Sequence, residues 1–306
     1  MEFLRFLEGL RAPFLDNLFC AVTELGGETA FLLAAIAAYW CYDKRFGYYM
    51  MSAGFIGTAL NQFLKILCRV PRPWVRDPAF TIVERARADA GGYSFPSGHT
   101  QNAVTVFGTA ARWTRHPAVR WTALGLIALV AFSRMYLGVH TPADVLFSLA
   151  LGTALTLALY PFFRRAEENP HGYTALFAGM LAAAAAYVLF IEFFPFAPGL
   201  DAENFASAQK NAYTLAGAIA GLCAAYPVER RLIRFTPQAP WWGQICKVVL
   251  GLAGVVLLKS LLKAPLSALF SGHPAANAVR YFAIVVFTVT VWPAAFPLFR
   301  GKRKSA

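Results

Sequence analysis

Three short groups of polar residues carry the side chains that could do chemistry in this sequence. Each group stands beside a long apolar segment, where an ionisable side chain costs free energy and therefore indicates a function. The groups are Lys65 with Arg72-Pro73, then Ser94-Phe95-Pro96-Ser97-Gly98-His99, and finally Ser133-Arg134 with His140 and Asp144.

Three cations and one expected helix start suit the binding of a tetrahedral oxyanion such as phosphate. Lys65, Arg72 and Arg134 supply the fixed positive charges. The segment Pro96-Ser97-Gly98 can open a helix, because proline favours the first turn and glycine allows a close backbone approach. The free N–H groups of such a helix start, together with the helix dipole, form an anion site.

The two histidines of these groups suit phosphoryl transfer. His140 and Asp144 are four positions apart, so a helix that begins near residue 140 would bring them to one face. A carboxylate on one imidazole nitrogen fixes the tautomer and leaves the other nitrogen free to attack. His99, beside the same anion site, could then donate a proton to the leaving oxygen.

The three groups together resemble the signature of the type 2 phosphatidic acid phosphatase family. That family includes lipid phosphate phosphatases, glucose-6-phosphatase and vanadium haloperoxidases. Its pattern is K-x(6)-R-P, then P-S-G-H, then S-R-x(5)-H-x(3)-D, and the sequence matches all three parts in order. The motifs cover residues 65–144, and the family's six-helix core would extend from about 27 to 195.

The resemblance implies a phosphatase that needs no metal and no cofactor and that works through a phosphohistidine intermediate. His140 would be the nucleophile, Asp144 would orient it, and His99 would act as general acid and then as base for the hydrolytic water. Ser133 would give only a supporting hydrogen bond. The residues expected to cradle the phosphoryl oxygens and stabilise the transition-state charge are Lys65, Arg72, Ser97, Gly98 and Arg134.

The composition predicts an all-α, polytopic membrane bundle that positions these groups. Hydrophobic residues make up 58% of the 306 residues and charged residues 14%, whereas a soluble domain has roughly 45–50% and about 25%. Disordered, collagen-like and coiled-coil classes are excluded, and a compact soluble enzyme is disfavoured. Because a helix of roughly 20 residues crosses the hydrocarbon, nine spans are expected, near 27–42, 46–67, 97–113, 118–137, 142–163, 173–195, 206–227, 241–262 and 278–299.

The chain is expected to have three regions. Residues 1–26 would form an amphipathic helix in the membrane interface and an entry segment, since apolar and charged residues take opposite faces of residues 1–11. Residues 27–195 would form the phosphatase core of six helices. Residues 196–306 would form a C-terminal transmembrane extension of unknown role, with a homodimer interface as one of its open uses.

The charge distribution predicts the orientation in the cell membrane. The formal net charge is +12, and Lys and Arg concentrate in alternate loops and in the C-terminal tail. By the positive-inside rule these segments are cytoplasmic, so the N-terminus, the loop 68–96 and the loop near 138–142 face outward. The site would then lie on the extracytoplasmic face. This explanation of the positive charge argues against a nucleic-acid partner, and the five scattered cysteines indicate neither zinc nor a disulfide framework.

The leading hypothesis is an integral membrane phosphatase acting on a lipid phosphate or diphosphate, such as polyprenyl diphosphate or phosphatidic acid. At a bilayer boundary an amphiphile can present its phosphate while its tail stays in lipid. Two alternatives stay open. One is a phosphatase of a soluble phosphate monoester that resembles glucose-6-phosphatase, and the other is a non-catalytic lipid transporter or scaffold.

Overall fold

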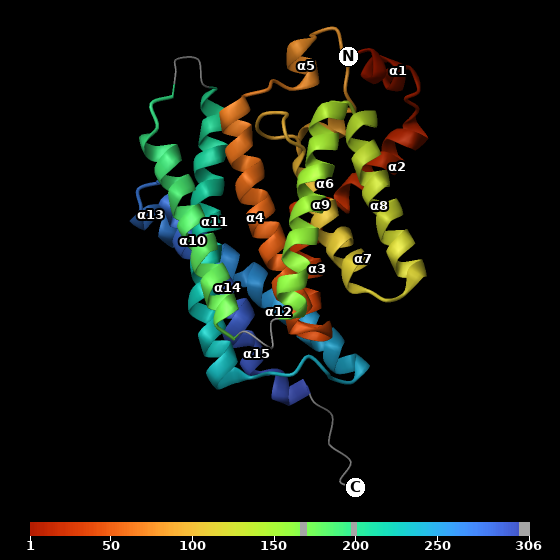
Figure 1. Cartoon of the computed structure of the whole chain (residues 1–306). Helices are drawn as coiled ribbons and strands as arrows, with labels where there is room; N and C mark the ends of the chain where they lie inside the picture. Colours follow the sequence, from red (N-terminus) through yellow and green to blue (C-terminus); the bar gives the residue numbers. More distant parts are fainter. Residues whose placement is uncertain (166–169, 197–200, 300–306) are drawn as a thin grey trace. The chain divides into compact units, whose positions relative to one another are not determined.

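The computed structural model describes residues 1–165, 170–196 and 201–299 of the chain (Figure 1). Within these ranges every regular element is a helix, as the composition predicts, and no strand occurs. The basic tail residues on which part of the topology prediction rests lie outside the described residues; they are Arg300, Lys302, Arg303 and Lys304.

In the described part of the chain, five helices are long and apolar enough to cross a membrane: Pro117–Tyr136, Pro142–Arg164, His171–Phe193, Trp241–Leu269 and Ala275–Ala294. A sixth span would be formed by Pro13–Glu24 and Glu28–Tyr42 together, a pair bent by 45°. The chain is therefore a multi-pass helical membrane protein, and the expected number of nine spans is not confirmed.

The three other expected spans are helical but are shorter or more polar than a typical span. Helix α4 (Lys44–Cys68) includes the buried polar side chains of Asn61 and Lys65. The segment from Gly98 to Trp113 has only 16 residues, and α11 (Ala202–Val228) begins with the polar stretch around Glu203. Polar side chains in these helices offset the apolar residues around them, so length and hydropathy alone do not identify them as spans.

The chain divides into two compact units, which are described separately. Unit 1 consists of Met1–Ala35, Tyr49–Arg164 and Phe196–Ala208, and unit 2 consists of Ile36–Tyr48, Arg165–Pro195 and Gln209–Ala306. The region boundaries expected from the sequence, 1–26, 27–195 and 196–306, stay a prediction.

Unit 1 is built around α8 (Pro117–Tyr136), which contacts α2 (Pro13–Glu24), α6 (Gly98–Ala103) and α7 (Thr109–Trp113). Its other complete elements are α1 (Glu2–Gly9), α5 (Pro73–Arg76), the 3₁₀ turn η2 (Glu84–Arg87), the π turn η3 (Val104–Gly108) and α9 (Pro142–Arg164). Helix α9 also packs against α6, where a Cβ on Gly152 would lie 3.0 Å from the Gln101 side chain. Glycine thus allows the close approach of these two helices.

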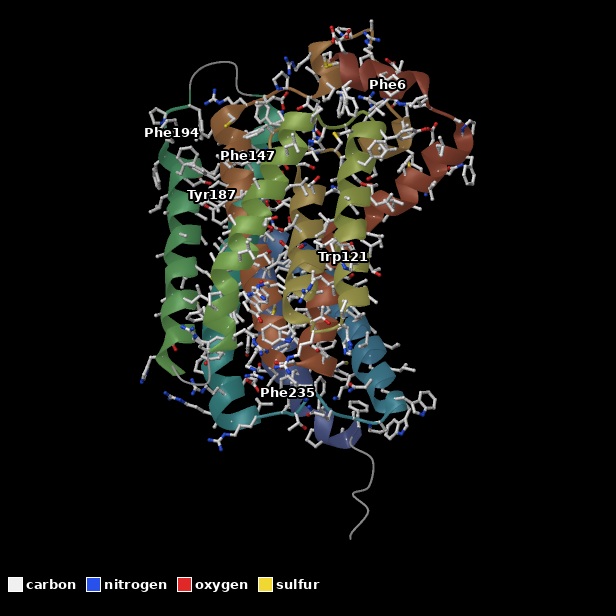
Figure 2. All side chains as sticks on the ribbon, turned by 45° about the vertical axis from the view of Figure 1, so that its right-hand side comes forward. Phe6, Trp121, Phe147, Tyr187, Phe194 and Phe235 are labelled. Carbon is white, nitrogen blue, oxygen red and sulfur yellow. The ribbon has the colours of Figure 1, made fainter. Side chains whose placement is uncertain are left out.

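The N-terminal helix α1 is amphipathic, as expected, and it also packs on the protein. Leu4 is buried together with Phe80, and the Arg5 guanidinium lies 2.6 Å from the Asp77 carboxylate. Phe6 lies on the exposed side of the helix (Figure 2). Helix α1 therefore holds the chain that follows α5, while its outer face remains available to the membrane interface.

Unit 2 contains the C-terminal helices. Its complete elements are the π turn η1 (Ala38–Tyr42), α10 (Pro170–Phe193), η4 (Glu229–Ile233), α12 (Trp241–Leu261), α13 (Lys263–Leu269), α14 (Ala275–Val286), η5 (Phe287–Val291), α15 (Trp292–Ala294) and η6 (Phe296–Phe299). The buried indole of Trp40 donates a hydrogen bond of 2.8 Å to the Thr288 carbonyl in η5. This bond connects Trp40, near the start of the unit, to its C-terminal helices.

Candidate active site

All eight residues that the motifs single out lie in unit 1, at or next to helix ends (Figure 1). Lys65 is in the last turn of α4, Arg72 precedes α5, Ser97 caps α6, Gly98 and His99 begin α6, Arg134 is in the last turn of α8, His140 is in the α8–α9 loop, and Asp144 is in the first turn of α9. Residues far apart in the sequence thus meet where N–H groups and side chains can surround an anion.

His140 is buried and held on both sides of its ring. Its Nε2 lies 3.0 Å from Nη1 of Arg72, and its Nδ1 lies 3.5 Å from Oδ2 of Asp144. Because a guanidinium can only donate, Nε2 must be the accepting nitrogen and the ring proton belongs on Nδ1, toward the carboxylate. At 3.5 Å the contact with Asp144 is an electrostatic one without hydrogen-bond geometry. This tautomer leaves the lone pair of Nε2 among the cations.

Two hydrogen-bond donors hold the Asp144 carboxylate in place. Oδ2 accepts hydrogen bonds from the Ser94 hydroxyl at 2.6 Å and from the backbone N–H of Thr141 at 2.8 Å. The backbone carbonyl of Asp144 accepts the N–H of Ser97 at 3.3 Å. These bonds connect the start of α9 to the segment that opens α6, so the carboxylate and the expected anion site are placed by the same contacts.

The Arg72 guanidinium is held by backbone carbonyls. Its Nε donates to Gly92 at 3.0 Å, Nη2 donates to Gly91 at 2.8 Å, and Nη1 donates to Val139 at 2.9 Å. The Lys65 ammonium donates to the next carbonyl in the same loop, that of Tyr93. The loop 91–93 therefore positions two of the three expected phosphate-binding cations.

The Arg134 side chain is completely buried and only partly paired. Its Nη1 donates to the Thr23 hydroxyl at 2.6 Å, whereas Nε and Nη2 have no hydrogen-bond partner among the described residues. The backbone carbonyl of Arg134 accepts the N–H groups of Val139 and His140, each at 3.2 Å. Unpaired guanidinium donors in a buried site are costly, and a phosphoryl group is the kind of ligand that satisfies them.

The start of α6 has the geometry of a capped helix. Ser97 is the N-cap, and its hydroxyl accepts hydrogen bonds from the backbone N–H and the hydroxyl of Thr100, at 3.4 and 2.9 Å. His99 follows in the first turn, where the charges of Arg134, Arg72 and Lys65 act on it. Burial and these three cations disfavour the protonated form of His99, so its expected role as proton donor depends on a bound anion that offsets their charge.

The electrostatics of the site favour a neutral His140 among cations. Burial lowers the pKa of His140 well below its usual range, and the charges of Arg72, Arg134 and Lys65 lower it further. Burial also lowers the pKa of Arg72, to about 10, so this guanidinium stays charged near neutral pH. His140 is therefore unprotonated, and its cationic neighbours are ready to bind an anion.

Two matches to families cover most of the chain. Residues 44–168 match the PAP2 superfamily, and residues 213–304 match the transmembrane extension of PAP2 superfamily phosphatases. Phosphatidylglycerophosphatase B of Bacillus subtilis strain 168 is 32% identical over an alignment of 165 residues, which covers 48% of this chain and 74% of that protein. The chain belongs to the PAP2 superfamily.

Other relatives match about half of the chain at lower sequence identity. The undecaprenyl-diphosphatase BcrC of Bacillus subtilis strain 168 is 29% identical, with 48% of this chain and 75% of that protein covered. The lipid A 4'-phosphatase of Porphyromonas gingivalis is 25% identical, with 56% and 79% covered. No solved structure matches the chain significantly.

The PAP2 motifs do not include every residue that shapes the site. Ser94 binds the Asp144 carboxylate and Thr23 binds Arg134, yet neither was singled out for a role in the site. Ser94 stands two positions before Pro96 and could have been suspected from its place beside the motif. Thr23 is 111 positions from its partner, so no spacing rule could have found it.

Metal binding is a separate question for this site. Across the ranges that the structure describes, no three His, Cys, Asp or Glu residues are grouped so that they could hold a metal ion. The independence from metal that the resemblance implies stays a prediction and is tested below with a chelator.

Proposed function

We propose that this PAP2 protein is an integral membrane phosphatase that hydrolyses a lipid phosphate or diphosphate through a phosphohistidine on His140. The proposal rests on the contacts that the two ring nitrogens of His140 make. Nε2 faces Arg72 at 3.0 Å and Nδ1 faces Asp144 at 3.5 Å. An imidazole so oriented, in a site where Nε and Nη2 of Arg134 have no partner among the described residues, is suited to attack phosphorus.

The first step forms a bond between His140 Nε2 and phosphorus and breaks the bond from phosphorus to the leaving oxygen. Nη1 of Arg72, which lies next to Nε2 of His140 in the structure, would then donate to a phosphoryl oxygen. Nε and Nη2 of Arg134 would donate to phosphoryl oxygens as well. Protonated His99 would give its proton to the leaving alkoxide or phosphate. The cations stabilise the charge that spreads over the phosphoryl oxygens in the transition state.

The second step breaks the nitrogen–phosphorus bond with water. His99, left unprotonated by the first step, would take a proton from the attacking water and so return to its starting state. Asp144 would stabilise the positive charge that His140 carries while it is phosphorylated. Inorganic phosphate leaves, and both histidines are regenerated.

Apolar side chains beside the site support a lipid substrate. Phe147 is on α9, three positions after Asp144, and its ring centroid lies 4.7 Å from that of Phe95 (Figure 2). Phe147 is 38% exposed and the adjacent Leu146 is 63% exposed. An apolar surface next to a phosphate site fits an amphiphile, and the related proteins named above also act on lipids according to their names.

The outer membrane face is the proposed location of the site. Arg112 and Arg115 precede α8, whereas Arg134 lies in its last turn. The 20 residues of α8 cover about 30 Å, the thickness of the hydrocarbon. If the basic loop at its start is cytoplasmic, as the positive-inside rule predicts, the site at its other end faces outward.

Phosphate release by the purified protein in detergent with EDTA tests this function. The substrates are undecaprenyl diphosphate, phosphatidic acid, phosphatidylglycerophosphate and glucose 6-phosphate, and the control is His140→Ala. We expect release from a lipid, resistance to EDTA, and a loss on the order of 10³-fold or more in the variant. Release from glucose 6-phosphate alone would support the soluble-substrate alternative. Lipid transfer without any release would support a non-catalytic role.

A further inference from the structure

Two carboxamide side chains in unit 1 are buried without a hydrogen-bond partner among the described residues. Asn61 is on α4 and Gln101 is on α6, and each is 2% exposed. In both side chains the nitrogen and the oxygen are unpaired. Neither residue belongs to the PAP2 motifs, and the proposed reaction does not use them. Because buried polar groups in folded proteins are almost always paired, four such atoms indicate a ligand that pairs with them.

Both carboxamides lie where α4 meets α6, beside the expected phosphate-binding residues. Asn61 is four positions, about one helix turn, before Lys65 on α4. Its Oδ1 would lie 3.9 Å from a Cβ on Gly98, the first residue of α6. Gln101 follows Gly98 by three positions along α6. The two side chains therefore line one contact between these helices, and Asn61 is the nearer of the two to the expected anion site.

Glycines on two neighbouring helices make room for the Gln101 carboxamide. A Cβ on Gly57 of α4 would lie 2.9 Å from its Nε2, and a Cβ on Gly152 of α9 would lie 3.0 Å from the same atom. A larger residue at either position would take the space that the carboxamide now occupies. An apolar side chain of similar size could fill this space and leave no polar atom unpaired, so packing alone does not explain a carboxamide there.

The chemistry of the two carboxamides favours water as their ligand. Each carboxamide offers two N–H donors and an oxygen that accepts. A phosphoryl oxygen only accepts hydrogen bonds, so phosphate would pair with the nitrogens and leave both oxygens unpaired. Water donates and accepts, and a buried water typically makes about three hydrogen bonds to groups that the protein itself leaves unpaired.

We propose that Asn61 and Gln101 bind water beside the start of α6, and that this water is the one that hydrolyses the phosphohistidine. The hydrolytic role rests on the proposed function, since it concerns the second step of that reaction. His99, the proposed base of this step, follows Gly98 directly in the chain. The water oxygen bonds to phosphorus, the bond from phosphorus to Nε2 of His140 breaks, and His99 takes the proton. Asn61 and Gln101 are thus positioning residues, which act through the water they hold.

The first test measures the decay of the phosphoenzyme separately from its formation. The purified full-length protein is mixed with lipid substrate labelled with ³²P in the transferred phosphate, chased with excess unlabelled substrate, and quenched under alkaline conditions. Asn61→Leu and Gln101→Met replace each carboxamide with an apolar side chain of similar size. We expect both variants to form the phosphoenzyme at the wild-type rate and to lose it about tenfold more slowly. A purely structural role would not slow the second step alone.

The matched control is Thr105→Val, which removes a buried hydroxyl that is already paired. The Thr105 hydroxyl donates to the backbone carbonyl of Gln101 at 3.1 Å. Its phosphoenzyme should decay as in the wild type. Wild-type decay in both carboxamide variants would overturn the proposal, and so would equal slowing in Thr105→Val. Absence of a phosphoenzyme in the wild type would instead refute the proposed function, and with it the hydrolytic role of this water.

The second test locates the water without reference to the reaction. A structure of the full chain in lipid nanodiscs, at a resolution that shows ordered water, should place a water oxygen within about 3 Å of each carboxamide. A dry contact between Asn61 and Gln101 would overturn the proposal whatever the kinetics show. Thermal unfolding adds a further check, because replacing a dry, unpaired carboxamide with an apolar side chain would stabilise the protein. We expect no such stabilisation for Asn61→Leu.

Discussion

At the scale of single residues, the orientation of His140 depends on a hydroxyl that the PAP2 motif does not contain. The Ser94 hydroxyl and the N–H of Thr141 hold Oδ2 of Asp144, the oxygen that faces Nδ1 of His140. A carboxylate held in this way keeps the ring in one tautomer and one position. We therefore expect Ser94 to be a positioning residue, which would act on the proposed nucleophile His140 through Asp144.

Replacing Ser94 with alanine is expected to lower kcat about 10- to 100-fold with little change in KM. A hydrogen bond to a charged group contributes roughly 1.5–3 kcal/mol, and each 1.36 kcal/mol of barrier is about a tenfold change in rate. KM should change little because Ser94 contacts no expected phosphate-binding side chain. Steady-state kinetics on the preferred lipid measure both constants.

The matched control for this variant is Ser133→Ala. Ser133 is also buried, but its hydroxyl donates to the Val130 carbonyl within α8, at 2.7 Å. We expect its kcat to stay close to that of the wild type. A similar loss in both variants would mean that any buried hydroxyl matters, and a normal kcat for Ser94→Ala would refute its positioning role.

The depressed pKa of His140 predicts the acid side of the pH profile. Burial and three cations keep the ring neutral well below its usual pKa, which is about 6.5 for histidine. The acid limb of kcat/KM, where protonation removes the nucleophile, should thus lie below pH 6.5. The same lowered pKa makes the stability of the fold depend on pH. Below about pH 6.5 His140 takes up a proton in the unfolded chain but not in the folded site, so the free energy of unfolding decreases as the pH falls.

A pH series of kcat/KM, with circular dichroism at each pH to confirm folding, measures this limb. The exposed His116 offers a control, since His116→Gln should leave the profile unchanged. An acid limb centred at or above pH 6.5 would contradict a nucleophile that is buried among cations.

At the scale of helices and turns, a close backbone contact places the first turn of α6. Gly26 lies between α2 and α3 (Glu28–Ala37), and a Cβ there would come within 2.5 Å of the His99 carbonyl and 2.7 Å of the Val130 side chain. No side chain fits without moving the helix start. The turn after α2 thus fixes the residue proposed as proton donor.

Gly26→Ala is expected to lower both stability and activity. Overpacking of this kind costs roughly 1–3 kcal/mol, and a shifted His99 should reduce phosphate release by about tenfold or more. The control is Gly125→Ala in α8, where a Cβ meets nothing within 4 Å; it should keep full activity and be as stable as the wild type or slightly more stable. Thermal unfolding in detergent and phosphate release measure the pair. Unchanged kinetics for Gly26→Ala would show that this contact does not position His99.

The sequence could predict which helix ends carry the site but not all that holds them. Spacing placed His140 and Asp144 correctly, because four positions across a helix start are a local relation. The contact of Thr23 with Arg134 and the burial of Leu4 against Phe80 are long-range packing. Composition cannot specify such contacts, and the role of α1 in holding the chain after α5 was accordingly missed.

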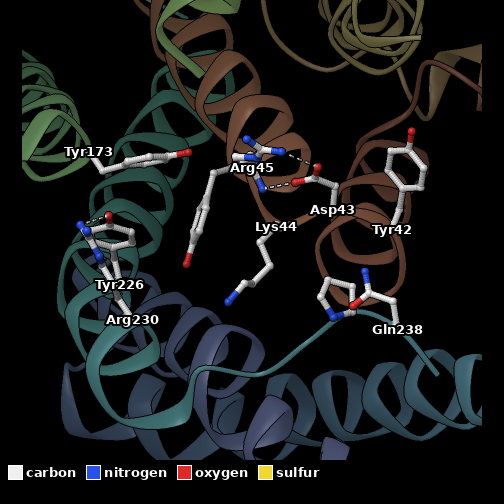
Figure 3. Close-up of a pocket in the computed structure, with 10 residues that line it drawn as sticks. Tyr42, Asp43, Lys44, Arg45, Tyr173, Tyr226, Arg230 and Gln238 are labelled. Atoms are coloured by element: carbon white, nitrogen blue, oxygen red, sulfur yellow. Dashed lines mark hydrogen bonds and ion pairs between the residues drawn. The ribbon is translucent and has the colours of Figure 1, made fainter. Parts of the chain in front are cut away.

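At the scale of the whole molecule, the all-helical membrane class followed from composition, whereas the number of spans did not. Hydropathy is an average over a segment, so buried polar residues such as Asn61 and Lys65 in α4 make a helix ambiguous by this measure. Residues 213–304, which carry no catalytic motif, belong to a recognised PAP2 transmembrane extension. A cavity of about 360 Å³ in unit 2, which contains this extension, is lined by residues far apart in the sequence, such as Tyr48, Tyr173 and Tyr226 (Figure 3), and only folding brings them together.

The most direct test of the account is to trap the phosphoenzyme. The protein is mixed with lipid substrate labelled with ³²P in the transferred phosphate, quenched under alkaline conditions that preserve phosphohistidine, and mapped by mass spectrometry. We expect label on His140 in the wild type and none in His140→Ala. In His99→Asn the hydrolytic water is not activated, so more label should accumulate on His140 when the leaving group can depart without a proton. Label on another residue, or turnover by His140→Ala at the wild-type rate, would contradict the account.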